Sequence, residues 1–459
     1  MKKTYVLDTN VLVQAPHALW SFENNDVVLP VAALEELDGL KKAEGEKGAN
    51  ARQAIRFLEQ LRQIGDLSRG VELPDGGMLR LELNCVDIEL PDSLKKDSPD
   101  NRILKVCRGL ENQGIANILV TKDIVVRIKA QMMGLKAEDF TTEQVPESKR
   151  QYTGRAEAYV ADEKMEEFKE KGLLPEDLYV MGEDGTHKPV EPVENQFFIL
   201  RSELFEKKTM LGKYQKGKIV PLAYAKAQPY GVKPRNAGQY FLQEALMMDA
   251  EEAPLVIVKG MAGTAKTFYT MAVGLSKVLE SIPPEYRKIL VCRSNAQFDK
   301  EIGFLPGTEQ EKISPLLRPV IDNLEVLLSQ EDKTGTSMLE DEKELRGKID
   351  YLFDAGIVTA EAINFIRGRS ISHTWLVIDE AQNLSPIQAK GIITRVGKGT
   401  KVILLGDPEQ IDQPFLDERT NGLSFAAEKM KGSPLCVQIT MNANECERSD
   451  LAWDAAQRM

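Results

Sequence analysis

The chain reads Val256-Ile257-Val258-Lys259-Gly260-Met261-Ala262-Gly263-Thr264-Ala265-Lys266-Thr267, an apolar strand that runs into a glycine-rich turn and then into helix-forming sequence. A bound triphosphate needs this arrangement, because backbone N–H groups of the turn cradle its phosphates. We expect these groups to belong to Gly260, Ala262, Gly263, Thr264 and Ala265. Lys266 would neutralise the phosphates and the Thr267 hydroxyl would hold Mg²⁺. The stretch therefore predicts a nucleotide-binding α/β domain.

One position departs from the usual motif G-x-x-x-x-G-K-[ST], since Ala265 stands where the second glycine belongs. We expect alanine to fit there with a negative φ angle, which leaves a variant of the motif. The alternative interpretation is a chance glycine turn in front of a helix.

A second apolar strand ends in adjacent acids, in the stretch Thr374-Trp375-Leu376-Val377-Ile378-Asp379-Glu380-Ala381-Gln382. A Walker B segment ends in this way, with Asp379 ordering Mg²⁺ and Glu380 orienting the attacking water. Taken alone, such a pair is more often a solvated acidic surface. Together with the glycine-rich turn it favours ATP hydrolysis.

Other polar residues fit the same chemistry less specifically. Asp407 and Gln410 follow the strand of residues 401–405 and would lie at the same sheet edge as Asp379, where they could sense the loss of the γ-phosphate. Gln239 could bond to adenine, although most surface glutamines have no such role. Arg448 could be an arginine finger, or simply part of a surface salt bridge.

Composition narrows the class of protein. The 459 residues are 42% hydrophobic and 28% charged, which is ordinary for a globular chain of two or three domains. The net charge of −12 predicts that nucleic acid is bound through local patches, with a marked salt dependence. No apolar run reaches the ~18 residues of a membrane helix. Five cysteines without C-x-x-C spacing suggest reduced thiols and a cytoplasmic protein.

Periodicity divides the chain into three regions. Residues 1–140 alternate strand and helix patterns, which implies a parallel sheet covered by helices. Residues 141–230 hold short strand-like pieces among turn signals and read as a small β-rich module or linker. Alternating strand and helix patterns return in residues 231–459. The fold class is thus α/β, with a β-rich insertion in the middle.

Acids stand at comparable places in the first region. Asp8 follows the first strand, Glu36 lies in the helix after the second strand, Asp100 begins a helix, and Asp123 lies just past the last strand. The carboxyl ends of parallel strands share one edge, so these four side chains can converge there. Mg²⁺ or Mn²⁺ between them would offset their repulsion and could activate water. Asp100 and Asp123 could instead be simple helix caps, and Glu36 part of a solvated face.

The order and spacing of these segments resemble a PIN-domain nuclease over roughly residues 1–140. The resemblance rests on the stretches Val6–Leu12, Leu29–Asp38, Asp100–Leu104 and Val120–Asp123. It implies a metal-dependent ribonuclease whose metal ligands are Asp8, Glu36, Asp100 and Asp123. The glutamate of the family precedes a leucine, which favours Glu36 over Glu35.

Residues 231–459 resemble the PhoH-like ATPases. The resemblance rests on residues 233–236, the glycine-rich turn, and residues 302–307, 366–370, 379–383 and 406–412. That family is similar to the first ATPase lobe of superfamily-one helicases. The whole chain thus looks like a PIN–PhoH fusion, with a PIN-like parallel sheet, a β-rich middle module and a single RecA-like P-loop lobe. The resemblance implies an ATP-dependent RNA helicase joined to a ribonuclease.

Such helicases close two lobes around one ATP, and the C-terminal region has room for only one. The arginine finger must then come from another subunit, so we expect a homo-oligomer. The resemblance suggests a hexameric ring. Single-stranded or structured RNA could pass Arg293, Arg367 or Arg369 inside it.

Two other interpretations stay open. The chain could be an ATPase whose PIN fold only binds RNA, or a ribonuclease toxin regulated by its ATPase half, with a small antitoxin-like partner. Single-stranded DNA also stays open as a substrate.

Overall fold

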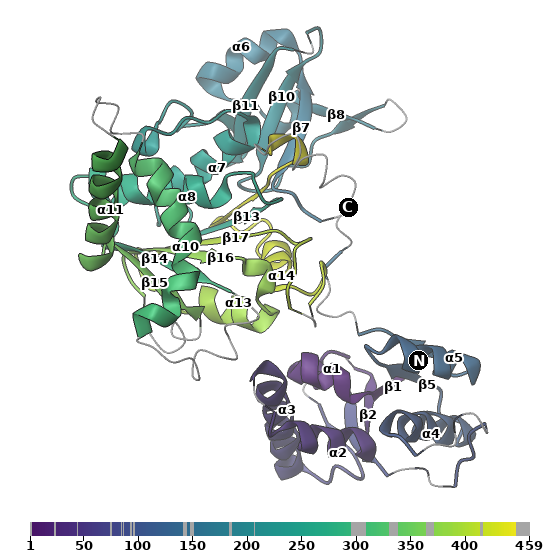
Figure 1. Cartoon of the computed structure of the whole chain (residues 1–459). Coiled ribbons are helices and arrows are strands. Elements are labelled where there is room, and N and C mark those ends of the chain that lie inside the picture. The colour runs from purple at the N-terminus through teal and green to yellow at the C-terminus, as the bar shows by residue number, and fades with distance from the viewer. Residues whose placement is uncertain are drawn as a thin grey trace. The chain divides into compact units, whose positions relative to one another are not determined.

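The structure is a computed structural model that divides into two compact units, Met1–Glu143 and Gln144–Met459 (Figure 1). The described part of the chain is residues 2–446 apart from residues 23, 44, 74–75, 84, 86, 92–93, 95–96, 141–144, 147–150, 183–185, 206, 295–308, 330–337, 364–370 and 414–415. The β-rich region and the C-terminal α/β region expected from the sequence lie together in the second unit.

The first unit is built on a six-stranded sheet of order β3-β4-β2-β1-β5-β6, parallel except at the β3–β4 pair. Its strands are β1 (Thr4–Leu7), β2 (Asp26–Pro30), β3 (Val71–Glu72), β4 (Met78–Glu82), β5 (Asn117–Val120) and β6 (Ala137–Glu138). Its helices are α1 (Thr9–Gln14), α2 (Val31–Leu40), α3 (Gly45–Ile64), α4 (Pro99–Asn112) and α5 (Ile124–Met132), with a 3-10 turn η1 (Pro16–Trp20) after α1.

Successive residues of the central strands belong to two different hydrophobic cores in this unit. Leu7 packs with residues of α1 and α3 in one apolar cluster, whereas Val6 packs with residues of α4 and α5 in another. Side chains alternate between the two faces of a strand, so helices cover the sheet on both sides. The carboxyl edge of the sheet is left for the polar residues that follow each strand.

The second unit begins with a mixed six-stranded sheet of order β12-β11-β10-β7-β8-β9. Its elements are β7 (Arg155–Val160), α6 (Asp162–Lys171), β8 (Tyr179–Met181), β9 (His187–Pro189), β10 (Phe197–Ser202), β11 (Thr209–Gln215) and β12 (Lys218–Pro221). Met165 and Phe168 of α6 pack on one face of this middle sheet. On its other face Phe197 stacks on Phe241 of α7 (Ala237–Met247), with ring centroids 4.7 Å apart. The middle sheet therefore shares a core with the α/β region that follows it.

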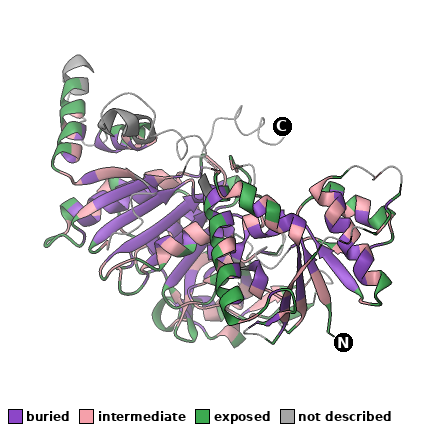
Figure 2. Cartoon of the chain, turned by 90° about the horizontal axis from the view of Figure 1, so that it is seen from below, coloured by how far each residue is buried: buried purple, intermediate pink, exposed green. Residues whose placement is uncertain are grey.

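That region has a fully parallel sheet of order β15-β14-β16-β17-β13-β18. Its strands, buried along most of their length (Figure 2), are β13 (Leu255–Lys259), β14 (Lys288–Arg293), β15 (Val358–Ala362), β16 (Thr374–Asp379), β17 (Lys401–Gly406) and β18 (Cys436–Thr440). Further helices are α8 (Lys266–Leu275), α10 (Glu309–Leu328), α11 (Met338–Asp354), α13 (Pro386–Ile393) and α14 (Gly422–Lys429), and short helical turns include η7 (Ala381–Asn383) and η8 (Ala443–Glu445). The order places β17 between β13 and β16, so the strand ends that carry the two ATPase motifs lie two strands apart.

Residues 151–154 join the two sheets of this unit. The N–H of Thr440 in the edge strand β18 donates to the carbonyl of Thr153 at 2.8 Å. Gly154 has a φ of +77°, and a Cβ there would lie 1.9 Å from the carbonyl oxygen of Gln438, so only glycine allows this approach. Lys259 Nζ donates to the carbonyl of Tyr152 at 3.3 Å. The strand that leads into the glycine-rich turn is thereby tied to the start of the unit.

A buried ion pair joins the same two sheets. Arg155 Nη1 on β7 lies 2.7 Å from Glu445 Oε2, and their side chains are only 8% and 6% exposed. The Glu445 carboxylate also accepts from the N–H groups of Gly238 and Asn442, each at 2.8 Å. One carboxylate thus fixes the middle sheet, the first turn of α7 and the chain after β18.

None of the helices within the described ranges is long and apolar enough to cross a bilayer.

We predict that Arg155→Ala lowers the free energy of unfolding of the second unit by about 3 kcal/mol, because it leaves a buried carboxylate without its cation. Arg201→Ala is the matched control. Arg201 pairs with Glu157 on the same sheet, but these side chains are 32% and 52% exposed. Its removal should cost no more than about 1 kcal/mol. Urea unfolding followed by circular dichroism measures both, and equal losses would contradict the prediction.

Candidate functional site

The glycine-rich turn connects β13 to α8 as the sequence predicts. Lys266 is the first residue of α8, and its Nζ donates to the carbonyls of Gly260 and Met261, the latter at 2.9 Å. Thr264 is fully buried and its hydroxyl donates to the Met261 carbonyl at 2.8 Å. The loop is therefore curled around the lysine ammonium at the amino end of α8. Backbone N–H groups and the helix dipole there favour a phosphate.

Ala265 takes a conformation that we did not expect. Its φ is +61° and its ψ is +24°, which is the left-handed region, so the expectation of a negative φ is wrong. The turn needs a left-handed residue immediately before the helix, whichever residue the sequence supplies. Alanine adopts this region at a cost of about 1–2 kcal/mol. The motif variant thus keeps the loop geometry and carries backbone strain.

The two ATPase motifs meet across the sheet edge. Thr267 Oγ1 lies 3.4 Å from Asp379 Oδ1, at the end of β16. Burial raises the pKa of Asp379, the neighbouring Glu380 raises it further, and Arg293 and Lys266 lower it. A hydroxyl beside a buried carboxylate is an oxygen pair that suits Mg²⁺ together with phosphate oxygens. These residues fit the metal that the motif implies.

Glu380 is held by two neighbours. Its backbone is left-handed, with a φ of +54°. Its Oε1 accepts from Arg293 Nη2 at 2.9 Å and its Oε2 accepts from Gln382 Nε2 at 2.7 Å. Gln382 is fully buried and also donates to the Gln410 carbonyl at 2.8 Å, and its Oε1 accepts from the Asp407 N–H at 3.1 Å. Gln382 therefore connects the end of β16 to the end of β17.

Gln382 lies two residues after Glu380 in the acidic motif, but its role could not be predicted from sequence. Asp407 is buried and its carboxylate accepts from the N–H of Glu409 at 3.1 Å. Gln410 is exposed and takes part through its backbone carbonyl. Both predicted sensor residues thus lie at the Asp379 edge, and a buried amide links them to Glu380.

Gln239 is buried at the start of α7. Its Oε1 accepts from the Arg235 N–H at 2.8 Å and from the Tyr269 hydroxyl at 3.2 Å, so its amide helps to hold the turn before α7. Its bonding to adenine stays a prediction. Of the predicted cationic residues, Arg293 is described at the end of β14. Arg448, Arg367 and Arg369 lie outside the described residues.

In the first unit, Asp8 is the N-cap of α1 and is only 4% exposed. Its Oδ1 accepts from the Thr9 N–H at 2.6 Å, and its Oδ2 accepts from Asn10 Nδ2 at 2.8 Å and from the Thr121 hydroxyl at 2.5 Å. Burial raises the pKa of Asp8 to about 6 against the opposing effect of the Thr121 and Thr9 hydrogen bonds, and Glu36 and Asp100 raise it further. Asp8 thus lies within electrostatic range of both acids.

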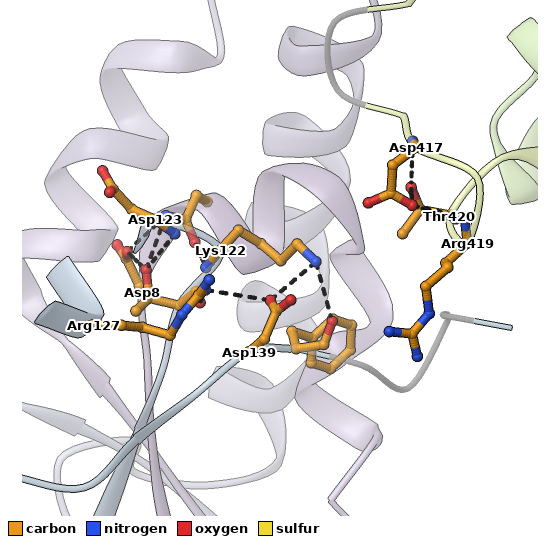
Figure 3. Close-up of polar contacts among 11 residues, drawn as sticks. Asp8, Lys122, Asp123, Arg127, Asp139, Asp417, Arg419 and Thr420 are labelled. Carbon is orange, nitrogen blue, oxygen red and sulfur yellow. Dashed lines mark hydrogen bonds and ion pairs between the residues drawn. The ribbon is translucent and has the colours of Figure 1, made fainter. Parts of the chain in front are cut away.

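Small polar residues connect the acids. The Thr9 hydroxyl donates to Glu36 Oε2. The Thr121 hydroxyl, which donates to Asp8, accepts from the backbone N–H of Asp123 at 3.0 Å. Figure 3 shows Asp8 and Asp123 next to each other. The roles of Thr9 and Thr121 were not predicted from sequence. The signal was their position, beside an acid at the end of a strand.

The remaining acids have structural partners as well. Asp123 is the N-cap of α5 and accepts from the N–H groups of Val125 and Val126 at 2.7 and 3.4 Å. Ser98, rather than Asp100, caps α4, and Asp100 Oδ2 lies 3.3 Å from Lys129 Nζ. Glu35 pairs with Arg102 at 2.7 Å, whereas Glu36 faces Thr9 and Asp8.

The described residues include no three His, Cys, Asp or Glu side chains close enough together to hold a metal ion by themselves. The repulsion around Asp8 is nevertheless the kind that a divalent cation relieves. Carboxylate oxygens are also the ligands that Mg²⁺ and Mn²⁺ prefer. The acids fit a metal site in donor type, and the assignment of Asp8, Glu36, Asp100 and Asp123 as ligands stays a prediction.

Comparison with known proteins defines the class. The family model for the PIN domain matches residues 5–141, and the model for the PhoH-like protein matches residues 231–458. PIN domains are generally nucleases and PhoH domains are of the P-loop ATPase type, so the fold and sites define a two-part hydrolase. Domains of these classes generally use a divalent metal and a nucleotide.

Whole-chain relatives give the family. Protein PhoH2 of Bacillus subtilis (strain 168) is 37% identical over 466 residues, which cover 99% of each chain. Proteins of the same name from Thermobispora bispora and Mycolicibacterium smegmatis are 33% and 32% identical, each over 98% of this chain and 95% of the relative. The chain belongs to the PhoH2 family, which confirms the PIN–PhoH fusion expected from its motifs. A domain of a functionally unknown protein from Methanocaldococcus jannaschii matches with a TM-score of 0.22, too low to support an argument.

We predict that Ala265→Gly raises the free energy of unfolding of the second unit by about 1 kcal/mol, because glycine adopts the left-handed region without strain. Ala262→Gly is the matched control in the same loop. Ala262 is not left-handed, so glycine there should cost about 0.5–1 kcal/mol through the entropy of the unfolded chain. Urea unfolding measures the free energy of unfolding of both variants. A loss of stability in Ala265→Gly would contradict the conclusion that Ala265 is strained.

The pKa of Asp8 predicts a pH dependence in metal-free buffer. The folded-state pKa of about 6 exceeds the ordinary 3.8, so the folded protein holds this proton more tightly than the unfolded chain. Stability therefore falls as the pH rises through 6, by about 1 kcal/mol between roughly pH 5 and pH 7.5. We expect Asp8→Asn to lack this loss. Comparing urea unfolding of the two proteins in EDTA at both pH values measures it.

Asp66→Asn serves as the control for that measurement. Asp66 is exposed, and the Ser68 hydroxyl lowers its pKa. It is ionised in both states above pH 5, so its removal should leave the difference between the two pH values unchanged.

Proposed function

We propose that this protein hydrolyses ATP to remodel RNA and cleaves RNA at its PIN domain with a divalent metal. The contact of Thr267 with Asp379 carries the proposal, because it joins the phosphate-binding loop to the acid that would order Mg²⁺. The two sites are on separate compact units, so each chemistry has its own scaffold.

In the ATPase site, Lys266 and the N–H groups of residues 260–265 bind the phosphates, and Gln239 contributes to adenine recognition. Mg²⁺, when bound to Thr267 and Asp379, supplies charge neutralisation at the phosphates. Glu380 orients the attacking water. Gln382 supports a sensing role for Asp407 and Gln410, because it couples both to Glu380. A change at the γ-phosphate would therefore affect the residues at the ends of both β16 and β17.

The described part of the second unit holds one parallel ATPase sheet, and we expect the finger residue to come from a second copy. Arg448 is our candidate. A head-to-tail homo-oligomer, in its closed form a hexameric ring, would supply it and would enclose single-stranded RNA.

In the PIN site, Asp8, Glu36, Asp100 and Asp123 would hold Mg²⁺ or Mn²⁺, which would supply Lewis acidity toward a phosphodiester and its attacking water. Thr9, Asn10 and Thr121 position the acids by hydrogen bonds. Because Asp8 is buried, its carboxylate cannot turn outward into solvent. The overall charge of −12 limits RNA contacts to local patches, so binding should weaken with salt. We place the reaction in the cytoplasm.

The test uses Asp8→Asn and Lys266→Ala in the full chain. We expect Asp8→Asn to lose RNA cleavage by at least about 100-fold and to keep ATP turnover, and Lys266→Ala to lose ATP turnover by a similar factor. Cleavage of a labelled RNA in Mg²⁺ or Mn²⁺, and phosphate release, are the measurements.

Each outcome addresses one half of the proposal. Normal cleavage by Asp8→Asn removes the nuclease assignment, and parent-rate hydrolysis by Lys266→Ala removes the motor assignment. A labelled single-stranded DNA of the same sequence, cut as fast as the RNA, would replace RNA as the preferred substrate.

A further inference from the structure

Glu380, the residue proposed to orient water, has both carboxylate oxygens in hydrogen bonds to side chains. Arg293 Nη2 donates to Oε1 at 2.9 Å and Gln382 Nε2 donates to Oε2 at 2.7 Å. Gln382 is fully buried and donates to the Gln410 carbonyl, which lies beyond the end of β17, so it is a fixed partner. Arg293 is different, because its side chain is 26% exposed and that of Glu380 is 31% exposed. One partner of this carboxylate is therefore accessible to a competing anion.

The pair with Arg293 opposes the role of Glu380. A guanidinium–carboxylate hydrogen bond is charge-assisted and about twice as strong as a neutral one. A carboxylate oxygen drawn toward a guanidinium has less freedom to accept from an attacking water. Glu380 needs to release Arg293, at least at Oε1, to orient water well.

Arg293 is placed to accept another partner. It is the last residue of β14, directly opposite Asp379 in the register with β16. Ligands of open α/β sheets bind outside the carboxyl ends of the strands, which is this edge. A guanidinium also binds phosphate through two parallel N–H bonds, as it binds a carboxylate. An RNA phosphodiester and Glu380 would thus compete for the same cation.

We propose that Arg293 is a switch residue that pairs either with Glu380 or with a backbone phosphate of bound RNA. RNA that takes Arg293 releases Glu380 Oε1 for the attacking water, while Gln382 keeps the carboxylate in place. ATP turnover then rises only when RNA is bound. The proposal rests on the proposed ATPase function and adds its regulation, with Arg293 acting as a positioning residue through Glu380.

Measuring RNA affinity in the absence of nucleotide tests whether Glu380 and RNA compete for Arg293. The probe is a fluorescein-labelled single-stranded oligouridylate, followed by anisotropy in the full chain. Arg293→Gln should weaken binding about tenfold, and Glu380→Gln should tighten it about fivefold, which corresponds to a pair worth about 1 kcal/mol. The double variant should show no tightening relative to Arg293→Gln, because the two residues act through one contact.

Turnover gives a second, independent measurement. Arg293→Gln should hydrolyse ATP without RNA at close to the RNA-stimulated rate of the wild type, and oligouridylate should add little. Arg293→Lys, which keeps a cation without the bidentate fork, should keep part of the stimulation. Arg287→Gln is the matched control, since Arg287 is an exposed arginine just before the start of β14, far from its Arg293 end, and should leave both affinity and stimulation unchanged.

Two results with the variants overturn the switch, and a third concerns the wild type. One is that Glu380→Gln tightens RNA binding equally in the wild type and in Arg293→Gln. That result would reflect only the loss of a negative charge. The other is a fall in RNA-free turnover in Arg293→Gln with an unchanged melting temperature. A wild type that hydrolyses ATP without any response to RNA refutes the switch alone, whereas one that hydrolyses no ATP refutes the proposed function as well.

Discussion

Both candidate sites bury a carboxylate beside other carboxylates, and the structure has to offset this repulsion in each. Around Asp8 the offset comes from short polar donors, namely the N–H of Thr9, the amide of Asn10 and the hydroxyl of Thr121. At Asp379 it comes from the charges of Arg293 and Lys266. Despite these hydrogen bonds, burial first and then the charges of Glu36 and Asp100 raise the pKa of Asp8 to about 6. Repulsion of this kind favours binding of a cation, which links the energetics of folding to the chemistry of each site.

The second unit is held together by a shared core rather than by a flexible linker. Phe197 of the middle sheet stacks on Phe241 of α7, and Arg155 lies over the same Phe241 ring, 5.2 Å from its centroid. Arg155 also pairs with Glu445, which in turn holds the N–H of Gly238 in the first turn of α7. An aromatic contact and a fully satisfied ion pair thus fix the helix that bears Gln239. The middle sheet is part of the framework of the ATPase site.

Local signals predicted the elements with strong periodicity or clear caps. The turn into α8 and strands β13, β16 and β17 follow from apolar runs and punctuating residues. Strands β15 and β18 could not be predicted, since each carries a polar residue inside the strand: Glu361 in β15, and in β18 Gln438, which donates to the carbonyl of Ala427. The middle helix α6 was missed because its sequence is almost wholly charged and only Met165 and Phe168 are buried.

Some residues of the two sites can likewise be predicted from local sequence, and others cannot. Acids at strand ends can be found from sequence because position alone brings them to one edge. The roles of Thr121 and Gln382 depend on strands that are distant in sequence and adjacent in the sheet, so no local pattern encodes them. The backbone of Ala265 is a further case, since the glycine-rich turn dictates its left-handed angle against the preference of the residue. Tertiary context decided these features.

The backbone of residues 151–154 has a mechanical consequence. This segment lies near the start of the second unit, and it hydrogen bonds to edge strand β18 through Thr153. Lys259 contacts Tyr152 and directly precedes Gly260. The start of the second unit and the strand that enters the phosphate-binding loop are therefore coupled, so neither can shift alone.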